Sequence, residues 1–227
     1  MDPQTPRLTD STVVPVFPLP NVVLFPGTVV PLHIFEPRYR SMVRDSSRGD
    51  GLIGMALLQP GYEEDYEGSP AIHEIGTVGR IEQLEPLTDG RFTLNLIGLQ
   101  RVEYHEIPSD RPYRLARVTP LPEQAVDESD PRILHAKLDL LAGQALLQRE
   151  LSDQGEPPLI LHEHVSYTLA VNGACANLPV SAEIRLELLM LDDPRERQIR
   201  ASALLSEVLE KVLSLKAKGT PQDRQSN

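Results

Sequence analysis

The 227-residue chain has a single cysteine, Cys175, and no long apolar run. One cysteine cannot form an internal disulfide, so nothing in the sequence indicates an oxidising compartment. No apolar stretch approaches the roughly 20 residues that cross a bilayer. The polar opening MDPQTPRLTDST is unlike a secretory signal. We therefore expect a cytoplasmic protein without a membrane partner.

Positive charge is also scarce. The chain carries 22 Lys and Arg residues against 33 Asp and Glu residues, which gives a formal net charge of -11. Because an acidic surface repels phosphate backbones, this balance disfavours a general role in nucleic-acid binding.

Motifs for catalysis and for cofactor or metal binding are missing as well. The sequence contains no G-x-x-x-x-G-K-[ST] loop for nucleotide phosphates, and no serine stands in a recognisable nucleophile setting with a partnered lysine. His162 and His164 are two residues apart, so on a helix they point about 200° apart and cannot hold one ion together. We expect no cofactor, no metal and no catalytic residue.

What is present is a β-type pattern over residues 13–121, after a lead-in over residues 1–12 that we expect to be disordered. Val30, Leu32 and Ile34 alternate as in a half-buried strand, and residues 22–25 form a further apolar segment. Asp89-Gly90 predicts a hairpin turn. A short helix over residues 37–47, with proline at its first position, interrupts the strands. About six short strands with little alternation of helix favour a closed or nearly closed barrel.

The second half has helical spacing. Residues 122–130 form a polar, acidic linker, residues 131–216 a helical region and residues 217–227 a disordered tail. The predicted helices begin at Asp130-Pro131, near Pro158, at Ser181 and at Asp193-Pro194, which are capping residues or prolines at the first helical position. Leu134, Leu138 and Leu141 keep helical spacing in the first of these helices. Asn172-Gly173 predicts the end of the second helix.

The stretch VFPLPNVVLFPGTVVPLHIFEPRYRSMV, residues 16–43, resembles the opening of the N-terminal, substrate-binding domain of Lon proteases. The strands around Ile75–Ile81, Asp89–Val102 and Pro112–Val118 and the closing helices around Asp193–Arg197 are similar to later parts of that domain. The resemblance covers residues 13–213. It implies an α+β fold: a PUA-like six-stranded β pseudo-barrel with one short helix, followed by a four-helix bundle-like subdomain.

The resemblance implies a non-catalytic protein-binding module. It would bind exposed apolar or unfolded segments, or dock a partner protein such as a separate ATP-dependent protease. The ATPase and Ser-Lys protease parts of a full Lon are absent from this sequence, so we expect a stand-alone domain that is not an enzyme. The alternative is an RNA-binding PUA-like module, for which Arg40, Arg44 and Arg48 could line the short helix; a solvated helix face explains the same spacing.

The loop over residues 59–70, QPGYEEDYEGSP, contains the partner-binding candidates Tyr62, Glu63, Glu64 and Tyr66. Aromatic side chains on a loop provide large contact areas, and the acidic residues favour a basic segment of a partner. A solvated loop with one tyrosine folded back onto the barrel explains the same residues.

Overall fold

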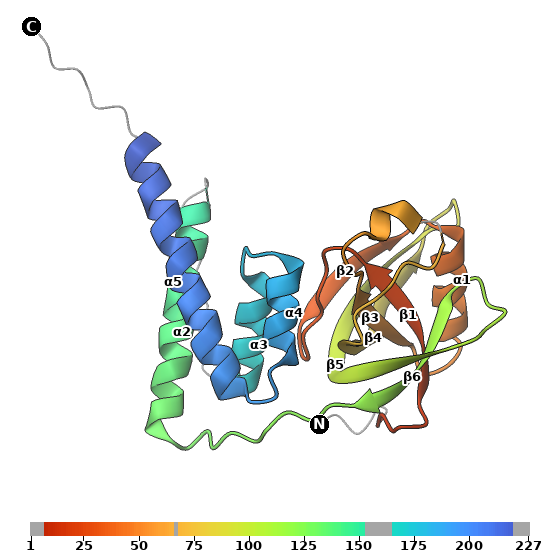
Figure 1. Ribbon diagram of the computed structural model, residues 1–227, viewed down its shortest axis with the longest axis horizontal. Helices are drawn as coiled ribbons and strands as arrows, with labels where there is room; N and C mark the ends of the chain where they lie inside the picture. The colour runs from red at the N-terminus through yellow and green to blue at the C-terminus, as the bar shows by residue number, and fades with distance from the viewer. Residues whose placement is uncertain (1–6, 66–67, 153–164, 220–227) are drawn as a thin grey trace, which may run out of the picture.

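The computed structural model describes residues 7–65, 68–152 and 165–219. A β half and a helical half lie side by side and are joined by an extended segment (Figure 1). The α+β class expected from the sequence is confirmed.

The β half is a six-stranded sheet that closes on itself. Its elements are β1 (Val13–Leu19), β2 (Val29–Ile34), α1 (Pro37–Ser46), β3 (Leu52–Leu57), η1 (Tyr62–Asp65), β4 (Ile75–Pro86), β5 (Phe92–Ile107) and β6 (Arg114–Pro120). The strand order is β2-β5-β4-β3-β1-β6, and β5 also pairs with β6. The long β5 closes the barrel because its first part pairs with β2 and its last part with β6. β2 is left as an edge strand.

The barrel is filled largely by apolar side chains, and the ring of Tyr104 lies among them. Tyr104 is buried, and its hydroxyl donates to the carbonyl oxygens of Met55 and Thr77 at 3.1 and 3.0 Å. A Cβ atom at Gly54 or Gly76 would lie 2.7 Å from the tyrosine ring. Glycine at these two positions therefore makes room for the ring that spans the barrel.

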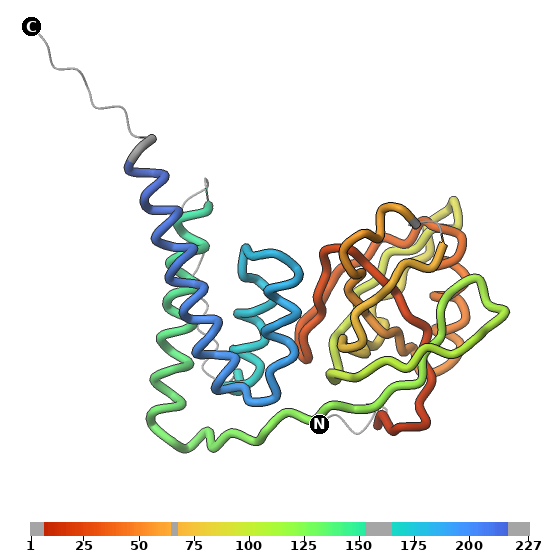
Figure 2. Tube along the Cα trace, in the orientation of Figure 1, coloured from red at the N-terminus to blue at the C-terminus, as the bar shows by residue number. Residues whose placement is uncertain are grey.

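The described residues of the second half form four helices, which can be followed along the chain in Figure 2. They are α2 (Pro131–Leu151), α3 (Tyr167–Asn177), α4 (Ala182–Met190) and α5 (Pro194–Gly219). The predicted capping residues are confirmed: Asp130, Ser181 and Asp193 accept hydrogen bonds from backbone N–H groups in the first turns of α2, α4 and α5. Each of these side chains therefore fixes the point at which its helix begins.

Several local predictions are wrong. Residues 22–25 form no strand, because Val23 and Phe25 turn away from the barrel and pack into the helical core. Part of the lead-in is ordered, since Leu8 is buried in the barrel core. The predicted start of the second helix near Pro158 lies outside the described residues. That helix does not end at Asn172-Gly173, because both residues lie within α3, where Asn172 is buried.

The predicted apolar spacing of α2 does not coincide with its buried face. Leu134 and Leu138 are exposed, whereas Leu140, Leu147 and the stem of Lys137 are buried. Lys137 is tolerated because its ammonium group donates to the carbonyl oxygen of Val165 at 2.9 Å. Among the residues of the expected disordered tail, 217–219 still belong to α5.

Two fully buried arginines join the halves. Arg101 of β5 donates to the carbonyl oxygens of Leu189 and Leu191 at 2.7 and 3.2 Å, and its guanidinium pairs with Asp192 at 2.7 Å. These three acceptors lie at the end of α4 and just after it. One barrel side chain thus satisfies the free carbonyl groups of a helix end in the other half.

Arg197 of α5 completes the network. It pairs with Glu123 of the connecting segment and donates to the side-chain oxygen of Asn172 at 2.5 Å. Asn172 in turn donates to the carbonyl oxygen of Pro26 at 3.0 Å. Each buried cation meets a carboxylate and backbone oxygens, which offset much of the cost of removing it from water; the Nε atom of Arg101 has no hydrogen bond and lies 3.8 Å from Glu123.

We expect Arg101→Met to destabilise the protein by roughly 3–5 kcal/mol, because it leaves buried acceptors without their donor. Urea unfolding followed by circular dichroism measures the change. The matched control is Arg195→Met, which removes an exposed pair with Asp193 and is expected to cost under about 1 kcal/mol. Equal losses in the two variants would contradict the role given to Arg101.

Candidate functional site

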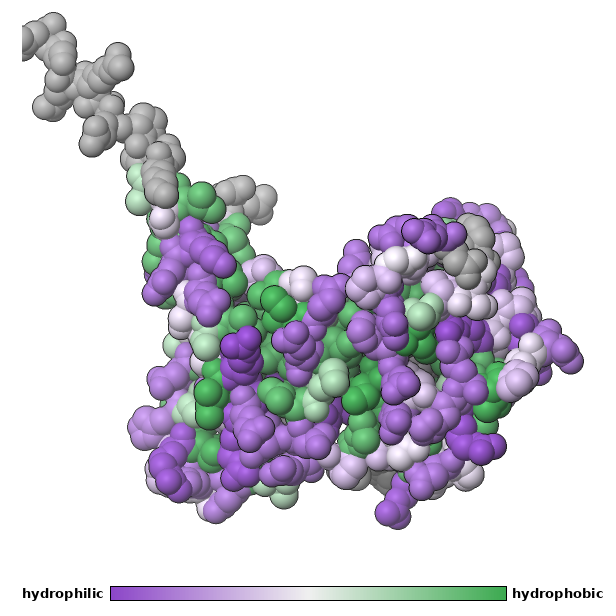
Figure 3. Space-filling model, viewed as in Figure 1, coloured by the Kyte–Doolittle hydropathy of each residue, from purple (hydrophilic) through white to green (hydrophobic). Residues whose placement is uncertain are grey.

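A groove of about 580 Å³ lies where the two halves meet. Its walls are the β1–β2 connection, the start of β2, and helices α2, α3 and α4. Apolar side chains also gather along this junction on the surface in Figure 3. The apolar lining consists of Val22, Val23, Val29, Val30, Leu141, Val165, Leu169, Ala170 and Ala176.

The β1–β2 connection is held rigidly against α3. Gly27 has φ 76°, and a Cβ atom there would lie 2.5 Å from Leu169 Cδ1. The left-handed backbone favours glycine at this position, and the missing Cβ lets Leu169 pack closely against the loop. The bond from Asn172 to Pro26 fixes the same loop from inside. The groove is thus a preformed feature of the junction.

One end of the groove is polar. Asn177 closes α3, and Arg185 of α4 donates from Nη2 to the carbonyl oxygen of Asn21 at 2.9 Å. Arg185 is the one charged side chain among the described residues that line the groove. The groove therefore has an apolar wall on α3 and a positively charged end at Arg185.

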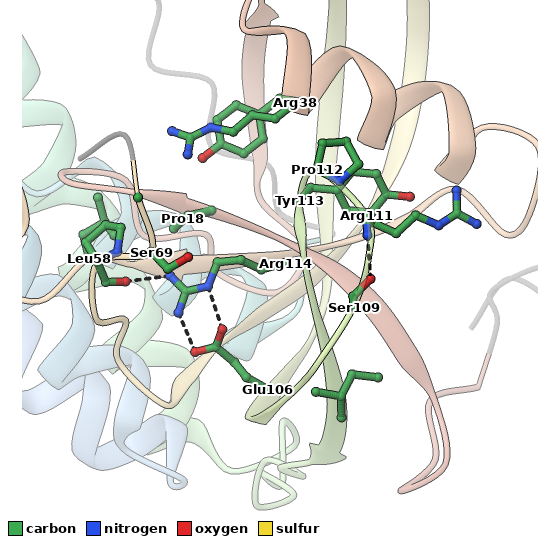
Figure 4. A pocket seen from close by; sticks show the side chains of 14 residues that line it. Pro18, Arg38, Leu58, Ser69, Glu106, Ser109, Arg111, Pro112, Tyr113 and Arg114 are labelled. Carbon is green, nitrogen blue, oxygen red and sulfur yellow. Dashed lines mark hydrogen bonds and ion pairs between the residues drawn. The ribbon is translucent and has the colours of Figure 1, made fainter. Parts of the chain in front are cut away.

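A second, smaller cavity of about 250 Å³ opens in the barrel. Figure 4 shows Arg114 pointing across it toward Glu106. Arg114 also donates to the carbonyl oxygen of Pro70 at 2.6 Å, and Arg111 pairs with Asp45 at 2.6 Å outside the cavity. Because these cations already have partners within the chain, the cavity has no evident excess of charge for an anion.

The predicted contact loop borders this barrel cavity only through residues 68–70. Tyr62 is partly buried and packs against the barrel core, whereas Glu63 and Glu64 are exposed on η1. Neither the groove nor the barrel cavity is lined by these three residues. Tyr66 lies outside the described residues. The structure does not bring the predicted site together with the groove.

The groove itself was not predicted from the sequence. Leu169 has the spacing of a core residue, and Val29 belongs to an alternating strand, yet 37 % and 49 % of their surfaces are exposed. Both positions are apolar in the sequence, which gives no sign that the two halves meet beside them. The pairing of α3 with the β1–β2 connection is a tertiary contact without a local signal.

Of the three arginines of α1, Arg38 and Arg44 make local contacts, whereas the Nε atom of Arg40 is buried without a hydrogen-bond partner. Arg38 pairs with Glu36 at 2.9 Å, and Arg44 lies over the ring of Phe92 at 5.7 Å. Arg48 follows the end of α1 and pairs with Asp45 at 3.7 Å. These contacts are those of a solvated helix and its flanks.

Metal-binding groups are not assembled in the described part of the chain, where no three His, Cys, Asp or Glu side chains lie together. His162 and His164 fall outside those residues. None of the described helices has the length and apolar character needed to cross a membrane.

A protein-family model described as the substrate-binding domain of ATP-dependent protease La (LON) matches residues 13–207. The chain belongs to the Lon substrate-binding domain family. This confirms the family inferred from residues 16–43 and places both halves, and the groove between them, within the matched domain.

Known Lon proteins match along most of this Lon domain. The Lon protease of Flavobacterium johnsoniae is 28 % identical over 200 residues, which cover 87 % of this chain and 24 % of that protease. The Lon protease of Parabacteroides distasonis is 29 % identical over 202 residues, covering 85 % and 24 %. The chain therefore spans about a quarter of the length of these proteases. The match is to their substrate-binding domain, and no ATPase or protease domain is matched.

Solved structures agree with this assignment. The crystal structure of a Lon N-terminal domain protein from Xanthomonas campestris is 28 % identical, has a TM-score of 0.61, and matches over 85 % of this chain and 98 % of that one. The N-terminal domain of a Mycobacterium avium complex Lon protease has a TM-score of 0.64 at 19 % identity, over 86 % of this chain and 99 % of that one. The second likeness shows the shared fold.

Cys175 is buried in the helical core of the Lon domain, and burial raises the pKa of its thiol to about 12. We expect Cys175 to remain unmodified by a thiol-specific reagent at pH 8 in the folded protein, because the reactive thiolate is suppressed and enclosed. In denaturant the same reagent should label it fully. Fast labelling of the native protein at pH 8 would contradict this packing.

Proposed function

We propose that this Lon domain binds exposed apolar segments of other proteins in the junction groove, in the cytoplasm, and makes or breaks no covalent bond. The observation that supports this is the groove's lining, in which apolar side chains stay partly open to solvent on a rigid framework. Apolar surface that remains exposed in a folded protein favours association with another apolar surface.

The gain available from such a contact is substantial. Each apolar side chain that moves from water into contact contributes about 25 cal/mol for every Å² buried. Leu169 of α3 and Val29 of β2 both line the groove and both remain partly exposed, so their side chains offer apolar surface to a bound segment. Because the walls are fixed by Gly27 and Asn172, little ordering is needed when a segment binds.

The loop with Tyr62, Glu63, Glu64 and Tyr66 is proposed as a second contact surface, for a folded partner such as a separate ATP-dependent protease. The exposed carboxylates of Glu63 and Glu64 support a basic surface on that partner. This docking role and the binding of apolar segments involve different residues, so each can be removed by substitution without the other.

The test of the groove uses a labelled polypeptide whose cysteines are alkylated so that it cannot refold. We expect its fluorescence anisotropy to rise when the protein is added, with little change between low and high salt, because the contact is apolar. The same polypeptide in its folded, unalkylated form should not bind.

Leu169→Gln should weaken this binding about tenfold, equivalent to about 1.4 kcal/mol. The matched control is Leu215→Gln, since Leu215 is 69 % exposed on α5 and lies outside the groove. Thermal melting verifies that both variants fold. An absence of binding up to about 100 μM, which is weaker than roughly 5.5 kcal/mol, would refute segment binding and leave docking to a folded partner.

A further inference from the structure

The start of β2 offers unpaired backbone groups beside the groove. Val29 and Val30 line the groove, and β2 pairs on one side only, with β5. No other described strand pairs with its second edge. An open strand edge of this kind accepts an extended chain, which adds to the sheet through main-chain hydrogen bonds.

The register shows which groups are free. Gly98 donates to the carbonyl oxygen of Thr28, so alternate residues from Thr28 onward face β5. Val29, Pro31 and His33 therefore direct their backbone groups to the open edge. Proline fits this position because it needs no hydrogen bond there. The edge offers the N–H groups of Val29 and His33 and the carbonyl groups of all three residues.

The charge at the far end specifies the ligand further. Among the described residues, no carboxylate forms an ion pair with Arg185. The pKa of Glu183, two residues earlier, is lowered mainly by a backbone hydrogen bond and by Ser181, and least by Arg185. The Nε atom of Arg185 is enclosed without a hydrogen-bond partner. In a chain with a net charge of -11, this lone guanidinium complements a carboxylate on the bound segment.

The position of Arg185 indicates where that carboxylate belongs. Along the groove, Gly27 contacts Leu169 near the start of α3, whereas Arg185 bonds to Asn21, and Asn177 ends the same helix. The cation is thus at the end remote from β2. A chain that pairs with β2 and then crosses the apolar part of the groove reaches Arg185 last. This order favours the terminal carboxylate of a chain as the group that Arg185 binds.

We propose, on the basis of the proposed function, that the groove binds the C-terminal segment of a partner protein. The segment is extended and apolar, runs antiparallel to β2 along its open edge, and ends with its terminal carboxylate on Arg185. Recognition then depends on a free chain end in addition to apolar surface.

The probe is a fluorescent peptide of about ten alternating valine and threonine residues, roughly 33 Å long when extended, with a free C-terminal carboxylate. The matched control peptide has the same sequence and a C-terminal amide in place of the carboxylate. We expect the acid to bind the native protein about tenfold more tightly, because the charge-assisted hydrogen bond to Arg185 is lost in the amide. This comparison uses unaltered protein and is independent of variant folding.

Arg185→Gln should remove the difference between acid and amide, whereas the control Arg48→Gln, on the exposed flank of α1, should keep it. The double comparison isolates the pairing of the two groups. On the β2 edge, Val29→Pro removes one outward N–H group and should weaken the acid about tenfold. Val29→Thr keeps that group and should stay within about twofold of the native affinity.

Equal binding of acid and amide to the native protein would overturn the inference, even if the alkylated polypeptide still binds and the proposed function stands. A tenfold preference that persists in Arg185→Gln would also overturn it, because another group would then hold the carboxylate. If neither the peptides nor the alkylated polypeptide bind, the proposed function fails and this inference fails with it.

Discussion

Two buried guanidinium groups determine how this domain is assembled. Arg101 reaches from the barrel to the carbonyl groups at the end of α4, and Arg197 reaches from α5 to Glu123 in the connecting segment. A buried cation is tolerated only when acceptors surround it, and here the acceptors come from the helical half and the connecting segment. The hydrogen bonding of each half is therefore incomplete without the other. This mutual dependence makes the junction a defined surface, in contrast to a flexible linker between two independent bodies.

The rigid junction explains the position of the groove. The β1–β2 connection leaves the barrel, places Val23 and Phe25 in the helical core, and returns to β2 at Gly27. Asn172 links this connection to Arg197, so the same network that joins the halves also fixes one wall of the groove. The groove opens beside this connection, between the start of β2 and helices α2, α3 and α4. Apolar residues beside it are positioned by the core beneath them, which keeps the binding surface ordered while it is empty.

Local sequence signals predicted the parts of this structure that depend on local chemistry. Asp130-Pro131 and Ser181 mark helix starts because their side chains cap the first free N–H groups, and the alternation of Val30, Leu32 and Ile34 marks a strand because one face is buried. The prediction failed where a distant contact decided the outcome. Val23 and Phe25 have the composition of a strand, but their side chains pack into the core of the helical half. The exposure of Leu134 and Leu169 depends on how the helices pack together, which spacing along one helix does not show.

The same limit explains why the candidate site in the tyrosine-containing loop and the groove are different places. Aromatic and acidic residues between glycines are visible in the sequence, whereas the groove is made from residues that each look like ordinary core. Its distinctive features arise only in the assembled fold. Among the described residues these are an edge strand with one neighbour, a close approach of α3 to Gly27, and an arginine without a carboxylate partner. An edge strand beside apolar surface invites unwanted pairing between copies, a risk that Pro31 reduces by withholding a donor. That the edge keeps its groups at Val29 and His33 while losing one at Pro31 is consistent with a strand that accepts a short, defined segment and resists extended sheet formation.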